Sequence, residues 1–112
     1  MYKRQERERI RQRVLHALEA LSAALSEQGR HPEAVDVALR AVLEEPLRES
    51  GQRALLAAYL AQGNRAEAQR AYTQFARLLR TELGVEPSRQ ITALMARGQA
   101  MASTSRRVAS RG

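Results

Sequence analysis

The sequence predicts an all-α protein built from stacked, tetratricopeptide-like helical hairpins, and three observations lead to this fold class. Of the 112 residues, 44% are hydrophobic but only 4% are aromatic, and the helix formers Ala, Leu, Arg, Glu and Gln dominate. Apolar residues recur at spacings of three and four along most of the chain, which is the period of an amphipathic helix. The third observation is an internal repeat of 34 residues, the length of one tetratricopeptide hairpin.

Five helices are predicted, and glycine or proline marks most of the boundaries between them. Gly29, Gly63 and Gly84 are placed to end the first, third and fourth helices, because glycine is the usual residue after a helix C-terminus. The second helix is expected to start at Pro32 and to end before Pro46. The predicted helices cover about residues 4–28, 32–45, 47–62, 64–83 and 87–97.

Each predicted helix carries an apolar stripe that we expect to face the core. The stripe of the first helix consists of Ile10, Val14, Leu18, Leu21 and Leu25. That of the second consists of Ala34, Val35, Ala38, Ala41 and Val42, and that of the third of Leu47, Gly51, Ala54, Leu55, Ala58 and Tyr59. The fourth carries Ala68, Ala71, Tyr72, Phe75, Leu78 and Leu79, and the short fifth carries Ile91, Leu94 and Met95.

The internal repeat relates the first two hairpins to each other. Its 34-residue offset aligns Gly29 with Gly63, Leu21 with Leu55, Leu25 with Tyr59, Glu33 with Glu67 and Ala34 with Ala68. Stacked hairpins cover each other's apolar faces, and small residues let the paired helices approach closely. Asn64, with Glu67 three residues later, is a capping-box-like helix start. Arg80 stands where a proline would end the second hairpin, so we expect the fourth helix to continue to Leu83.

The positive charge of the chain lies at its two ends. The formal net charge is +7, of which residues 1–13 contribute +4 and residues 98–112 contribute +3, while residues 14–97 are neutral. The ends are therefore contact arms or solubilising tails, and the body is not a basic surface. Arg4, Arg7 and Arg11 are the candidates for contacts with phosphates or an acidic partner. Residues 98–112 are expected to form a flexible basic tail, and residues 1–97 the domain.

The sequence offers no feature of an enzyme, a metal centre or a cofactor site. It contains no cysteine, and His16 and His31 are too few ligands for a metal. Paired glutamates such as Glu82 and Glu86 have no nucleophile or phosphate loop beside them, which indicates solvated surface. No apolar run approaches the ~20 residues of a membrane span, and no secretory signal is present. We expect a cytoplasmic protein.

Several motifs together resemble one family. Glu6-Arg7-Glu8-Arg9-Ile10-Arg11 leads into Leu15 to Leu21, and Gly29-Arg30, Glu33-Ala34 and Glu45-Pro46-Leu47-Arg48-Glu49 follow. The last and most specific motif is Glu82-Leu83-Gly84-Val85-Glu86-Pro87. Residues 6 to about 97 resemble the bacterial transcriptional activator domain of SARP-type regulators of antibiotic pathways.

The resemblance implies a transcription-activating role, in which the helical domain supports dimer contacts or contacts with RNA polymerase subunits. In that family the domain follows a winged-helix DNA-binding domain, but nothing in these residues resembles one. The chain is then either a fragment or a solitary member. DNA would be read mainly by the missing domain, and arginines of the first helix would make at most non-specific, salt-sensitive phosphate contacts.

A partner-binding face is expected on the first helix of each hairpin, because these helices line the concave side of tetratricopeptide-like stacks. The candidate residues on this face are His16, Glu19, Ser26, Ser50, Arg53 and Leu60. The partner is then an RNA polymerase subunit, a sister chain or a neighbouring domain. The alternative is a generic adaptor that binds a peptide in the groove, which rests on the repeat alone; a nucleic-acid-binding arm protein rests on the basic ends.

Overall fold

The computed structural model describes residues 2–111, with side chains for residues 3–100. This part of the chain consists of five helices and contains no strand. They are α1 (Tyr2–Glu27), α2 (His31–Glu44), α3 (Glu49–Ala61), α4 (Arg65–Leu83) and α5 (Arg89–Arg111). The molecule is elongated and thin, with extents of 64 × 34 × 17 Å. The all-α prediction is confirmed, and the boundaries of the first four helices agree within about two residues.

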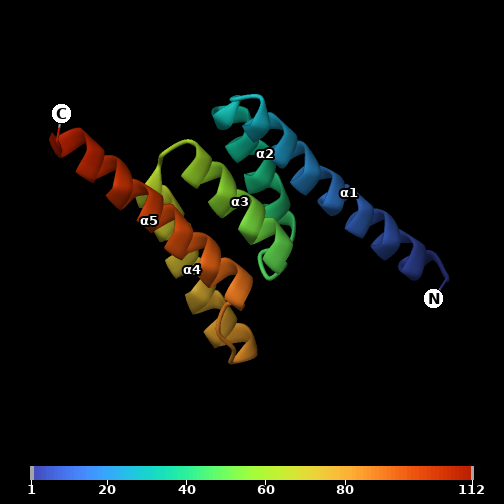
Figure 1. Cartoon of the computed structure of the whole chain (residues 1–112). Coiled ribbons are helices and arrows are strands. Elements are labelled where there is room, and N and C mark those ends of the chain that lie inside the picture. Colours follow the sequence, from blue (N-terminus) through green and yellow to red (C-terminus); the bar gives the residue numbers. More distant parts are fainter. Residues whose placement is uncertain (1, 112) are drawn as a thin grey trace.

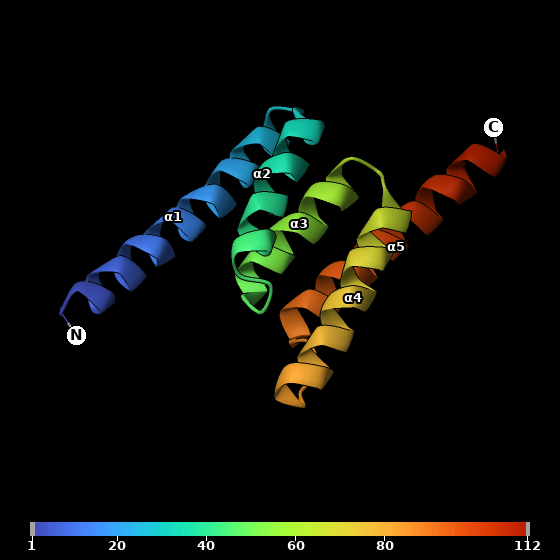
Figure 2. The ribbon, with the colours of Figure 1, turned by 180° about the vertical axis from the view of Figure 1, so that it is seen from behind.

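The helices run alternately up and down, so that α1 with α2 and α3 with α4 form antiparallel hairpins (Figure 1). Helix α3 lies between α1 and α5 and contacts both of them. Helix α3 occupies the centre and contacts all four other helices. Seen from behind, α1 and α5 project from opposite ends of the body (Figure 2). The packing of α3 therefore decides whether the two hairpins form one unit.

The turns of the two hairpins are built alike, as the 34-residue repeat predicts. Gly29 has a φ of 76° and Gly63 a φ of 81°, a left-handed conformation that favours glycine. The N–H of Arg30 donates to the Leu25 carbonyl at 2.9 Å, and 34 residues later the N–H of Asn64 donates to Tyr59 at 2.9 Å. The Asn64 side chain also accepts from the Glu67 N–H at 3.3 Å, which confirms the predicted cap.

The core is filled mostly by small and branched apolar side chains. Alanines lie where helices cross, and Ala34, Ala38 and Ala68 are completely buried. One cluster joins α1, α2 and α3 around Leu25 and Val35. The other joins α3, α4 and α5 and contains Leu56, Ala68, Phe75, Leu79, Ile91 and Met95. The predicted stripes of α2, α4 and α5 thus contribute to the core.

The predicted stripe of α1 is partly wrong. Ile10, Val14 and Leu21 are 57%, 52% and 48% exposed. Leu25 of the predicted stripe is buried at 7% exposure, but Leu15 and Ser22, one position after Val14 and Leu21, are each only 1% exposed. A pattern of apolar residues does not include Ser22, because serine is polar. Its hydroxyl donates to the Ala34 carbonyl at 2.8 Å, so the serine is buried with its hydrogen bond satisfied.

The repeat mate of Ser22 is Leu56, which is completely buried. Leu56 packs in the same cluster as Ala68, and Ala68 is the repeat mate of Ala34. The same place in the two hairpins is therefore held by a hydrogen bond in one and by apolar packing in the other.

Helix α5 is longer than the short helix that the sequence predicts, because it runs through Gly98 to Arg111. Gly98 does not end the helix. A Cβ at this position would lie 2.7 Å from Cδ2 of Leu60, so the missing side chain lets α5 pack closely against α3. Of the predicted flexible tail, residues 98–112, only residues 98–100 have described side chains, so its flexibility stays a prediction.

The corrected face of α1 can be tested with neighbouring residues. Leu15→Ala removes a buried side chain and should lower the free energy of unfolding by about 2–5 kcal/mol. Val14→Ala, the matched control at the exposed position, should change it by less than about 0.5 kcal/mol. Urea denaturation followed by circular dichroism measures both. Equal losses for the two variants would contradict the assignment.

Candidate partner-binding site

The predicted face on α1 and α3 is divided between an internal polar junction and an open groove. Glu19 of α1 accepts a hydrogen bond from Ser50 of α3 at 2.9 Å and one from Arg48 at 2.7 Å. The side chains of Glu19 and Arg48 are only 12% and 21% exposed. Glu19 and Ser50 therefore hold α1 and α3 together, and their polar groups are already engaged inside the molecule.

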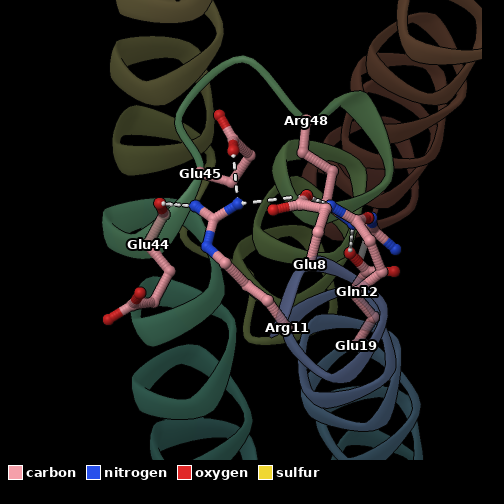
Figure 3. Close-up of polar contacts among 7 residues, drawn as sticks. All are labelled: Glu8, Arg11, Gln12, Glu19, Glu44, Glu45 and Arg48. Atoms are coloured by element: carbon pink, nitrogen blue, oxygen red, sulfur yellow. Dashed lines mark hydrogen bonds and ion pairs between the residues drawn. The ribbon is translucent and has the colours of Figure 1, made fainter. Parts of the chain in front are cut away.

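Arg11 is engaged in the same junction (Figure 3). Its guanidinium donates to the carbonyl of Glu44 at 2.6 Å, near the C-terminus of α2, and pairs with Glu45 at 2.9 Å. It thereby satisfies a carbonyl that the end of α2 leaves without a helical partner. Arg48, in the connection between α2 and α3, also donates to Gln12 of α1. The two arginines join α1 to the end of α2 and the start of α3.

The groove lies between α3 and α5 and has a volume of about 640 Å³. Arg53 borders it on α3, and its guanidinium donates to the side-chain oxygen of Gln90 on α5 at 2.7 Å. Arg89 and Arg97 of α5 also line the groove, and both are exposed. The apolar lining consists of Ala57, Ala93 and Leu94. No carboxylate is among the described residues that line it.

The other predicted contact residues lie apart from this groove. His16 is exposed on α1, and Ser26 is half-buried with a hydroxyl that has no partner among the described residues. Leu60 packs toward Gly98 and borders a smaller hollow between α3, α4 and α5. Arg4 and Arg7 are exposed on the first turns of α1. The six predicted residues therefore do not form one continuous site.

Sequence reasoning missed the contribution of α5 to the groove. The sequence predicts a face on α3 without a partner helix, whereas α5 places Arg89, Ala93 and Arg97 along the opposite wall of the groove. A signal for this wall is present in the sequence. These three residues are four apart, which puts them on one side of a helix.

Other ionisable groups take part in local pairs. A hydrogen bond from Arg80 holds the pKa of the Glu86 carboxyl below its usual value, and Arg30 lowers the pKa of Glu33 in the same way. Burial raises the pKa of the Tyr59 phenol. In the described part of the chain, no three acidic, histidine or cysteine side chains are grouped to hold a metal ion. No helix there is long and apolar enough to cross a membrane.

Comparison with known proteins identifies a family that matches the chain and a solved structure with a similar fold. The family model described as "Bacterial transcriptional activator domain" matches residues 1–97. Among solved structures, Mycobacterium tuberculosis EmbR in complex with low affinity phosphopeptide is similar, with a TM-score of 0.71 and 24% identity. The match covers 82% of this chain and 24% of the EmbR chain. No curated protein sequence matches.

The junction around Arg48 should contribute to stability. Arg48→Ala leaves Glu19 half-buried without its cation, and we expect a loss of about 1–3 kcal/mol in the free energy of unfolding. Arg30→Ala is the control, because it removes an arginine from an exposed pair with Glu33 and should have no measurable effect. Urea denaturation compares them. An Arg48→Ala variant as stable as the parent would show that the junction is energetically neutral.

Proposed function

The chain belongs to the bacterial transcriptional activator domain family, and from this membership we propose that it is the protein-interaction module of a transcription activator. The domain is regulatory and non-catalytic. The family match supports the proposal because it spans residues 1–97, which include α1 to α4 and the first part of α5. The resemblance drawn from the sequence motifs is thereby confirmed at the level of the domain.

The arrangement of polar groups supports binding of a protein partner at the surface of the domain. The most buried ion pair, between Glu19 and Arg48, joins helices inside the molecule. The groove between α3 and α5 remains open, and all of its lining residues belong to these two helices. A module that works by binding needs such an accessible, shaped surface on a rigid body.

The proposed partners are RNA polymerase subunits, a sister chain or a neighbouring domain. The match covers 24% of the EmbR chain. In our proposal, a DNA sequence is read mainly by residues outside this domain. Such a module would act in the cytoplasm, where transcription takes place in bacteria. Arg4 and Arg7 would add non-specific phosphate contacts when the activator is on DNA.

The first test is a fluorescence anisotropy titration of the labelled chain with bacterial RNA polymerase holoenzyme. A random DNA duplex is titrated in parallel, and both are measured at low and moderate salt. Saturable binding to polymerase that survives moderate salt is expected, because a docking surface depends less on counterion release than phosphate contacts do.

Two outcomes would redirect the proposal. Binding to DNA alone, lost as salt rises, would favour the basic-arm function. If neither polymerase nor DNA binds, sedimentation of the chain alone distinguishes the remaining partners. A dimer would assign the module to sister-chain contacts, and a monomer would assign it to a neighbouring domain.

A further inference from the structure

We propose that the groove between α3 and α5 binds a short acidic peptide segment that carries an apolar residue between two carboxylates. This inference rests on the proposed function, since it names the chemistry of the partner segment that the module takes. It is carried by three features of the groove: its size, its cationic rim and its apolar floor.

The size and shape suit a short segment. A volume of about 640 Å³ lies within the range of about 300–1,000 Å³ that is usual for sites binding small ligands. The walls are two packed helices, and Arg53 is fixed across the groove by its hydrogen bond to Gln90. One wall therefore positions a cation before any ligand arrives.

The rim is cationic. Arg53, Arg89 and Arg97 line the groove, and the guanidinium groups of Arg89 and Arg97 form no hydrogen bond or ion pair within the described structure. Glu49, one turn before Arg53, accepts a hydrogen bond from the Ser88 N–H at 2.9 Å and is not among the lining residues. The three positive charges are thus left without a lining carboxylate, and a ligand with carboxylates complements them.

The spacing of the cations indicates the spacing of the ligand's carboxylates. Arg89 and Arg97 are eight residues apart on one helix, which corresponds to about 12 Å along its axis. An extended peptide covers this distance in about four residues. Ala93 lies midway between the two arginines, and with Ala57 and Leu94 it forms an apolar floor for a central side chain. The matching pattern is Glu-x-Leu-x-Glu.

A peptide fits the groove better than a nucleic acid does. Nucleic-acid strands are bound by long cationic tracks and by aromatic side chains on which bases stack. No aromatic residue lines this groove, and its floor is aliphatic. The body of the chain, residues 14–97, is electrically neutral, so the cationic rim is a local feature.

The test is a fluorescence anisotropy titration of a labelled, capped Glu-x-Leu-x-Glu peptide with the full chain. The matched control peptide has glutamine in place of both glutamates. Arg89→Ala and Arg97→Ala should each weaken binding of the acidic peptide by about tenfold, as expected for a lost charge-assisted hydrogen bond. Arg77→Ala, an exposed arginine of α4 outside the groove, should leave binding unchanged. Circular dichroism confirms that each variant folds.

The outcomes separate this inference from the proposed function. Selective binding of the acidic peptide that depends on Arg89 and Arg97 supports the groove assignment, whatever happens with polymerase. The groove assignment would be overturned if the acidic peptide did not bind, or if the glutamine peptide bound equally tightly. It would also be overturned if Arg77→Ala weakened binding as much as the two groove variants do. Tighter binding of a random DNA strand that depends on the same arginines would overturn it in favour of a nucleic-acid site. If Arg89→Ala and Arg97→Ala bind polymerase as tightly as the parent chain does, the proposed function stands but the groove is not the surface that binds polymerase.

Discussion

The close approach of helices around α3 is the constraint on which the rest of this structure depends. Each hairpin has an apolar face that it cannot cover alone, and α3 covers part of every other helix. This is possible because small side chains lie at the crossings, where Ala34, Ala58 and Ala68 are buried to within 1% of their surface. Larger side chains there would force the helices apart and would open both clusters of the core at once.

The sequence predicts the fold well where the signals are local. The left-handed glycines at 29 and 63 and the Asn64 cap act within a few residues, and each determines a turn. The prediction fails where contacts between two helices determine which residues are buried. The buried face of α1 includes Ser22, whose hydroxyl is satisfied by the Ala34 carbonyl, and Gly98 lies inside a helix where Leu60 leaves no room for a side chain. Neither partner is near in sequence.

In the candidate site too, local features can be predicted from the sequence, whereas contacts between helices cannot. Spacing indicates which residues share a helix face, and Arg53 of the predicted face borders the groove. Whether a polar side chain is available depends on its partners across helices. Glu19 and Arg11 are engaged by residues about 30 positions away in the chain, a distance over which a single sequence carries no pairing information. The spacing of Arg89, Ala93 and Arg97 indicates that they share one face of a helix, but that this face lies opposite α3 is known only from the packing of α5.

The difference between Ser22 and Leu56 has a consequence for the two hairpins as building blocks. A hydrogen bond to the Ala34 carbonyl is directional and fixes how far α2 can slide along α1, whereas the apolar contact of Leu56 tolerates small shifts. The two hairpins therefore share the 34-residue sequence repeat, but one cannot replace the other. In a longer array made by duplicating the second hairpin, the added hairpins would lack this hydrogen bond, and apolar packing alone would hold their two helices together at this position.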